Sequence, residues 1–361
     1  MTARHHRLPG LDGLRALAVL MVVFHHLCSQ GALGRWPALQ AMLQQGSFGV
    51  QIFFVLSGFL ITWLLLKEES RSGTIDIARF YFRRSLRIIP PAFFYLAVIL
   101  LLTVAGVLAV GTRDLVYSAL FIRNAYGVGG SPEVSHYWSL AVEEQFYLTW
   151  PFLLLVLRGR TRLLVTAALI VLLTVWRSWT SLHFGVTAAG AHALLFGCLL
   201  AQLRQTRSTS PYVLQGMLQS PVTFAASAAV ILAVTFFRVP DGATAGWLQV
   251  WPILATTLIV NYSVAGHRDL ISRFLNLGPV EWVGRLSYSL YLWQELFCWS
   301  PVSNQYAASA WPLLVALSFA CASISYYLVE RPALSAREKL EHRWYPASLP
   351  RLSSRLESLS S

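Results

Sequence analysis

The sequence predicts an all-α fold, a polytopic integral membrane protein with about ten transmembrane helices and both termini in the cytoplasm. Of its 361 residues, 56% are hydrophobic and only 12% are charged, whereas soluble domains have about 25% charged residues. Apolar runs of about 20 residues, the length that crosses a bilayer, follow one another with short loops between them. This composition leaves no room for a separate soluble domain.

Ten apolar runs have the length of a spanning helix. They lie at residues 14–33, 48–66, 90–110, 138–157, 163–183, 186–203, 220–238, 247–265, 280–299 and 309–329. A further stretch at 114–126 is too short to span, and we expect it to be re-entrant or interfacial. The chain is expected to form one transmembrane domain over 1–340 and a poorly ordered cytoplasmic tail over 341–361.

The basic residues predict the orientation in the membrane. Most of the 28 Lys and Arg residues fall in alternate loops and at the two ends of the chain. Because cytoplasmic loops collect positive charge, this pattern predicts cytoplasmic termini and an even number of spans. The net charge of +12 is therefore a topology signal and not a nucleic-acid surface. The first helix follows no evident signal-cleavage site and is expected to stay in the protein.

The first helix, LDGLRALAVLMVVFHHL at residues 11–27, carries ionisable groups that hydrocarbon disfavours. Arg15 and His26 are about 16 Å and three turns apart, so they point to the same side. His26 is predicted to lie near the middle of the bilayer, where ionisable groups usually face a cavity. His25 is turned by about 100° from it. We expect one histidine to be functional and the other to pack. The alternative is that both only hydrogen-bond to neighbouring helices.

A second signal is HYWSLAVEEQFYLTWP at residues 136–151, which is predicted to enter the membrane from the external side. Trp138 suits the interfacial aromatic belt. Glu143, with Glu144 beside it, lies about 7.5 Å deeper. A carboxylate at this depth can reach His26, orient its tautomer and stabilise its protonated form. The alternative partners of Glu143 are structural arginines, Arg123 or Arg177.

Four arginines stand at helical spacing in RFYFRRSLRIIPP, residues 79–91, just below the third predicted span. Arg79, Arg83 and Arg87 share one helix face, and Arg84 lies next to them. Guanidinium groups bind phosphate through two parallel hydrogen bonds. The segment therefore predicts either a phosphate-binding site or a cytoplasmic anchor on anionic lipid.

Three further stretches carry polar residues in apolar surroundings. Ser57 and Gly58, in the middle of the second span, permit close approach of helix backbones. The stretch GRLSYSLYLWQELF, residues 284–297, is rich in hydroxyl groups and predicts a polar cavity wall. The stretch YYLVERPAL, residues 326–334, is predicted to end the last helix, with Glu330 in a structural pair or a headgroup contact.

Together and in this order, these stretches resemble the acyltransferase-3 family of membrane O-acyltransferases from about Leu8 to Leu334. The most specific pieces are the pair Arg15 and His26 and the motifs FFVLSGFLIT, FYFRRSLRIIP, WSLAVEEQFYL, SYSLYLW and VERP. Each is weak by itself, but the ordered set is hard to obtain by chance.

The resemblance implies transfer of an acyl group, most often acetyl, from cytoplasmic acyl-CoA to a carbohydrate hydroxyl at or beyond the membrane. Implied acceptors are exopolysaccharide, the O-antigen of lipopolysaccharide, peptidoglycan or a similar glycan, free or lipid-linked. It also implies a multi-pass protein of the bacterial inner membrane, surrounded by lipid, with no metal and no permanently bound cofactor. The chain is expected to be the stand-alone form, without the extracellular hydrolase-like domain of some relatives.

The resemblance also implies roles for individual residues. His26 is the implied catalytic histidine, Arg15 its helix partner, and Glu143 the first glutamate of the family's Trp-Ser-Leu-x-x-Glu pattern. Arg84 and Arg87 form the implied pair for the acyl donor. The remaining candidates are Arg83 for the donor and, for the cavity, His25, Ser57, Trp138, Ser139, Glu144, Ser287, Tyr288 and Tyr291.

Two mechanisms fit these roles: His26 is a general base for the sugar hydroxyl, or it carries the acyl group as a nucleophile. Hydroxyls of Ser287, Tyr288 or Tyr291 are candidates to stabilise the oxyanion. The chain has Gln51 and Gln294 where the family often has Asp and His, which removes one imidazole from a two-histidine scheme. The rival interpretation is a transporter or flippase for a sugar or lipid-linked glycan.

Overall fold

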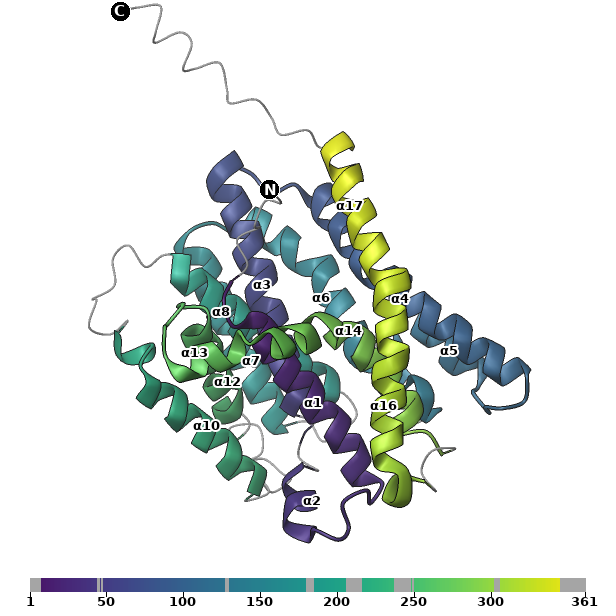
Figure 1. Ribbon diagram of the computed structural model, residues 1–361. Helices are drawn as coiled ribbons and strands as arrows, with labels where there is room; N and C mark the ends of the chain where they lie inside the picture. Colours follow the sequence, from purple (N-terminus) through teal and green to yellow (C-terminus); the bar gives the residue numbers. More distant parts are fainter. Residues whose placement is uncertain are drawn as a thin grey trace, which may run out of the picture.

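The computed structural model describes residues 8–43, 46, 48–126, 130–179, 185–205, 216–236, 248, 250–301 and 306–344. Within these residues the chain forms helices and no β-strand. Figure 1 shows the helices gathered in one bundle, with α16 and α17 as one long rod along its side.

Six helices build the centre of the bundle: α1 (Leu11–Ser29), α3 (Phe48–Ser72), α4 (Ile77–Val104), α6 (Tyr137–Val156), α8 (Gly185–Gln205) and α14 (Gly278–Cys298). Around them lie α7 (Arg160–Trp179), α10 (Pro221–Phe236), α12 (Val250–Ser263), α16 (Ala307–Ser325) and α17 (Arg331–Trp344). Short connecting elements are α2 (Pro37–Leu43), α5 (Thr112–Ala119), α13 (Leu270–Leu275) and the 3-10 turns Arg123–Tyr126 and Pro132–Val134. Each predicted run overlaps one of these helices in its described residues, and the stretch at 114–126 forms only the short helix α5 and a 3-10 turn.

The arginine-rich segment is helix and not loop, which corrects the predicted boundaries. α3 continues to Ser72 and α4 begins at Ile77, so the stretch 67–89 between the predicted runs 48–66 and 90–110 is helical except for the turn 73–76. The Asp76 side chain accepts a hydrogen bond from the backbone N–H of Arg79 at 2.9 Å and caps α4. Arginine is a good helix former, but its charge interrupts the apolar run by which the span was located.

The last helix also continues beyond its predicted end. A π-helical turn, Tyr326–Glu330, joins α16 to α17, which ends at Trp344. The α17 sequence is charged and mostly helix-forming, so an apolar-run criterion does not detect it. Both Arg79 and Arg83 of α4 bind the Glu341 carboxylate of α17. The predicted tail therefore begins inside a helix, and residues 345–361 lie outside the described residues.

The connection between α4 and α6 is held by a buried ion pair. Arg123 lies 3.4 Å from Asp114, and both side chains are buried. The same carboxylate accepts hydrogen bonds from the backbone N–H and the hydroxyl of Ser131, both at 2.8 Å. Arg123 is thus engaged within this connection, and the Arg177 side chain lies outside the described residues.

Glycines allow α3 and α8 to pack backbone against backbone, as predicted for Gly58. A Cβ on Gly58 would lie 2.0 Å from the Leu194 carbonyl oxygen, and one on Gly197 would lie 2.1 Å from that of Val55. Small residues that let the backbone of one helix approach the other in this way are typical of close helix pairs in membranes.

We expect Gly58→Leu to lower the free energy of unfolding by about 1–3 kcal/mol, because the new side chain must push the two backbones apart. Heating the detergent-solubilised protein and following its monodisperse fraction measures this change. Gly278→Ala is the control, since a Cβ there meets nothing within 4 Å. An unchanged midpoint for Gly58→Leu would contradict the close approach.

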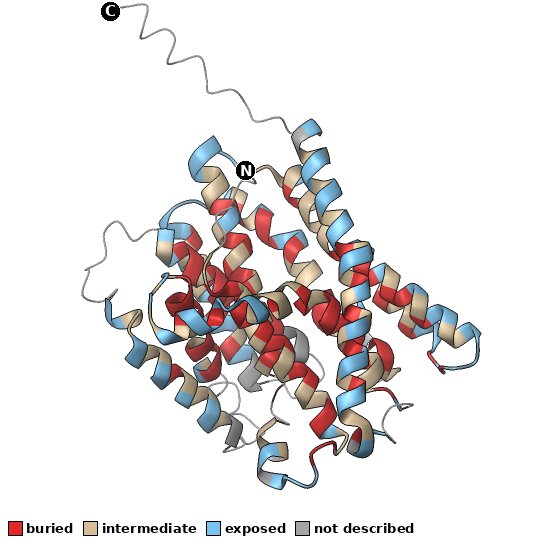
Figure 2. Ribbon diagram, viewed as in Figure 1, coloured by how far each residue is buried: buried red, intermediate tan, exposed pale blue. Residues whose placement is uncertain are grey.

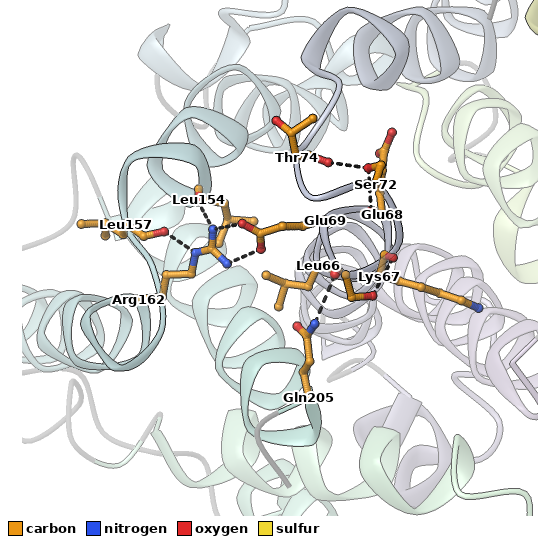
Figure 3. Close-up of polar contacts among 11 residues, drawn as sticks. Leu66, Lys67, Glu68, Glu69, Ser72, Thr74, Leu154, Leu157, Arg162 and Gln205 are labelled. Atoms are coloured by element: carbon orange, nitrogen blue, oxygen red, sulfur yellow. Dashed lines mark hydrogen bonds and ion pairs between the residues drawn. The ribbon is translucent and has the colours of Figure 1, made fainter. Parts of the chain in front are cut away.

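Arg162, at the start of α7, joins three helices (Figure 3). It donates hydrogen bonds to the carbonyl oxygens of Leu154 and Leu157 at the end of α6. It also binds both carboxylate oxygens of Glu69 on α3, at 2.6 and 2.9 Å. Its side chain is 9% exposed. A single guanidinium therefore caps α6 and fixes it to α3.

We expect Arg162→Met to cost on the order of 3 kcal/mol of stability, because Glu69 and the carbonyl groups of α6 lose their partner together. The control is Arg285→Met, which removes a half-exposed pair at 3.8 Å from Glu281 and should cost about 0–1 kcal/mol. Thermal midpoints of the purified proteins give the comparison. Equal midpoints for the two variants would show that Arg162 does not hold α6.

Among the residues that the structure describes, four helical segments have the length and hydropathy to cross a membrane: Leu11–Ser29, Phe48–Ser72, Ile77–Val104 and Ser309–Glu341. Large apolar side chains are exposed on the outer surface, among them Leu101, Val104, Val156 and Leu328. Figure 2 shows such exposed faces along α10 and α16, around a buried centre. This arrangement is that of a membrane protein with lipid-facing helices. The ten-span count and the cytoplasmic termini stay predictions.

Candidate active site

A cavity lies between α1, α3, α4, α6 and α14, where the two apolar clusters of the core meet. It holds about 720 Å³ of empty space, its open mouth included. The lining combines apolar, hydroxyl and charged side chains: Arg15, Val50, Phe53, Phe54, Leu56, Ser57, Arg84, Arg87, Ile88, Ser139, Leu140, Glu143, Tyr147, Ser287, Tyr288 and Tyr291.

Three arginines form the basic side of the cavity. Arg15 enters from the first turns of α1, and Arg84 and Arg87 come from α4. Each repels the other two electrostatically. Arg15 is partly neutralised by Asp12, 3.2 Å away, and the Arg84 guanidinium lies over the Tyr147 ring at 5.1 Å. The cavity lining holds these three guanidinium groups and one carboxylate, and guanidinium groups suit an anionic ligand.

Glu143 of α6 is the acidic side chain of the lining. It lies beside the hydroxyls of Ser57 and Tyr147, which hydrogen-bond to each other. Arg84 attracts both Glu143 and Glu144. Oε1 of Glu144 is buried without a hydrogen-bond partner within the described chain. The two glutamates predicted from the α6 motif therefore lie near the arginines of the cavity.

Hydroxyl groups of α14 form the opposite wall, as the sequence predicted. Ser287, Tyr288 and Tyr291 all line the cavity. The Tyr288 hydroxyl donates to the Ile88 carbonyl oxygen at 3.0 Å. The Tyr291 hydroxyl and Ser139 of α6 hydrogen-bond at 2.6 Å. These contacts fix the wall to α4 and α6.

His26 lies beyond the cavity, farther along α1 from the arginines. Its Nδ1 is 2.7 Å from Oε1 of Gln294 on α14. Its ring packs against Trp299, with centroids 5.0 Å apart, and His25 lies beside it at 5.3 Å. Gln294 follows Tyr291 by one helical turn, about 4.5 Å along α14. The histidine is thus about one turn from the hydroxyl wall.

A carboxylate that interacts electrostatically with His26 is Glu295, in the polar stretch 284–297, whereas the α6 motif predicted Glu143 as its partner. Glu295 is fully buried; its Oε2 lies 2.6 Å from Nδ1 of His136, and its Oε1 accepts a hydrogen bond from Ser135. No hydrogen bond joins Glu143 to His26 within the described part of the chain. The sequence shows this glutamate within the polar stretch 284–297 but gives no reason to place it near His26.

Other predicted candidates lie outside the lining. Arg83 pairs with Glu341 of α17, Trp138 packs edge-on against Phe54, and His25 is next to His26.

Glu330 is buried at the π-helical turn, accepts a hydrogen bond from Ser289 at 2.8 Å, and attracts Arg87 and Arg15. Glu330 therefore belongs to the arginine cluster and not to a headgroup contact.

Ionisable side chains gathered around a cavity inside a helical bundle of this kind are typical of a functional site. Comparison with known families gives the class: the acyltransferase-3 family model, described as an acyltransferase domain, matches residues 8–330. The chain belongs to this family of membrane acyltransferases.

Curated relatives cover most of the chain. It is 30% identical to the O-acetyltransferase OatA of Staphylococcus aureus over 354 residues, 90% of this chain and 57% of that protein. It is 28% identical to the peptidoglycan O-acetyltransferase OatA of Listeria monocytogenes over 366 residues, 92% of this chain and 57% of that protein. The chain thus spans 57% of the length of either relative. No solved structure matches it significantly.

Proposed function

We propose that this protein transfers an acetyl group from acyl-CoA to a hydroxyl of a cell-envelope carbohydrate at the bacterial inner membrane. The observation that carries the proposal is the cavity, where three arginines face a single glutamate. Burying several guanidinium groups costs free energy unless they bind groups of opposite charge. Arginine binds phosphate in bidentate fashion, and acyl-CoA carries its phosphates at the end far from the thioester. The names of the two relatives support acetyl as the group and peptidoglycan or a similar glycan as the acceptor.

The spacing along α1 supports a donor that extends from the arginines to His26. Arg15 and His26 are about 16 Å apart along the helix axis, a distance that the pantetheine arm of acyl-CoA would bridge. In one mechanism, His26 removes the proton of the acceptor hydroxyl, whose oxygen attacks the thioester carbonyl and releases the CoA thiol. In the other, His26 takes the acyl group first and passes it to the hydroxyl. Ser287 or Tyr291 would donate to the oxyanion.

The experiment that tests the proposal is a transfer assay on membranes that contain the full chain. Radiolabelled acetyl-CoA is supplied with purified peptidoglycan or exopolysaccharide, and membranes with an empty vector are the control. We expect label in the glycan only when the protein is present, and its release by mild alkali, as for an O-ester. Movement of glycan across the membrane without label transfer would support a transporter instead.

A further inference from the structure

We propose that Gln294 is a positioning residue that fixes the tautomer of His26 and makes Nε2 its reacting nitrogen. The reaction at Nε2 rests on the proposed function, whereas the assignment of the tautomer does not. Gln294 is completely buried on α14, and its side chain contacts His26 on α1 across the interface of these two helices.

The hydrogen bonds of Gln294 determine which way its amide points. Its Nε2 donates to the Tyr291 carbonyl oxygen at 3.3 Å, and its Oε1 lies 2.7 Å from Nδ1 of His26. Rotating the amide by 180° would place Oε1 against the Tyr291 carbonyl, so two acceptors would face each other. The amide oxygen therefore faces the imidazole. Because a carbonyl oxygen only accepts, Nδ1 of His26 must carry the hydrogen.

A neutral imidazole with its hydrogen on Nδ1 has a lone pair on Nε2. Within the described residues, Nε2 of His26 has no hydrogen-bond partner. The Trp299 ring supports one face of the imidazole, so the plane of the ring and the direction of the lone pair are set together. The arrangement holds Nε2 ready to accept a proton or an acyl group.

The tautomer allows a balanced general-base step. Nε2 takes the proton of the acceptor hydroxyl, the hydroxyl oxygen bonds to the acyl carbon, and the carbon–sulfur bond breaks. The departing thiolate then takes the proton from Nε2, and His26 is neutral again. While the imidazolium exists, its Nδ1–H bond to Gln294 becomes charge-assisted and shorter.

The titratable groups near His26 do not orient its ring, and this role falls to Gln294. His25 lies next to it on α1. Glu295 of α14 acts on His26 electrostatically, but its carboxylate is 2.6 Å from His136 and binds Ser135. A neutral amide orients the ring without holding it in the protonated form, which cannot act as a base.

Solid-state ¹⁵N NMR of the full chain in lipid bilayers tests the tautomer directly. Histidine is labelled with ¹⁵N in both ring nitrogens, and the His26 signals are assigned by comparison with His26→Asn. At a pH where the imidazole is neutral, we expect a protonated Nδ1 and an unprotonated Nε2. Gln294→Met, which keeps the volume but lacks the acceptor, should show hydrogen on Nε2. A wild-type His26 with an unprotonated Nδ1, or a Gln294→Met spectrum like that of wild type, overturns the proposal.

The matched control is Gln202→Met, the same substitution at a buried glutamine of α8 that donates to Thr166. It should leave the His26 signals unchanged.

In the transfer assay, Gln294→Met should lower kcat at least about tenfold. Gln294→Glu keeps the acceptor and should retain transfer, with the acid limb of the pH–rate profile moved to higher pH, since a carboxylate stabilises the imidazolium.

The two readouts separate the inference from the proposed function. If wild type transfers no label, the proposed function fails while the NMR spectrum still decides the tautomer. If wild type transfers label and Gln294→Met matches its kcat and pH profile, Gln294 does not position the catalytic histidine. A loss of transfer in Gln202→Met equal to that in Gln294→Met would assign the effect to packing and overturn the positioning role.

Discussion

Replacing His26 by alanine is expected to abolish acyl transfer while the protein still accumulates in the membrane. The imidazole is the proposed proton or acyl acceptor, and general acid–base catalysis is worth about 10²- to 10⁴-fold in rate. Alanine removes both the reacting nitrogen and the hydrogen bond to Gln294. The helix itself tolerates alanine, the best helix former. Label in the glycan, divided by the amount of protein from an immunoblot, gives the loss.

His25→Ala is the matched control for this prediction. It removes the same side chain from the neighbouring position of α1, where the ring lies 5.3 Å from that of His26. We expect this variant to keep most of the transfer activity. If His26→Ala transfers label as well as wild type, the mechanism is wrong and transport becomes the leading function. Equal losses in both variants would assign the two histidines to packing.

Sequence alone located the helices well where the membrane imposes apolar composition. The runs for α1, α6 and α14 differ from the observed helices by a few residues. The predicted helix boundaries were wrong at α4 and α17, where an arginine-rich or charged segment extends an apolar helix. Hydropathy detects burial in lipid, whereas a helix continues wherever its residues favour it and a cap or a neighbour satisfies its ends.

The site was predictable along each helix but not between helices. The spacing of Arg15 and His26 along α1 needs only the rise per residue. The structure adds that Arg84 and Arg87 of α4 line the same cavity as Arg15. Which of the carboxylates lies near His26 was not predictable, because depth in the bilayer does not determine how each helix is rotated. That rotation directs Glu143 toward the arginines and places Glu295 near His26.

Removing one arginine of the cavity is expected to weaken donor binding more than it slows the chemical step. In Arg84→Gln or Arg87→Gln, we expect KM for acetyl-CoA to rise about 10- to 100-fold. A hydrogen bond to a charged group is worth about 1.5–3 kcal/mol, and loss of binding that is equal in ground and transition states appears in KM. Initial rates of label transfer at increasing acetyl-CoA concentration measure KM and kcat separately.

Arg83→Gln separates a donor site from a basic membrane anchor, the two interpretations that the sequence left open. It removes the same charge from the residue next to Arg84, but the Arg83 guanidinium binds Glu341 of α17 and does not line the cavity. If the cavity binds the phosphates of the donor, KM should change much less in Arg83→Gln than in Arg84→Gln. If the arginines act only through surface charge on anionic lipid, neutralising either residue should have the same small effect. Equal changes of KM would therefore place the donor phosphates outside the cavity, because surface charge depends little on which side chain carries it.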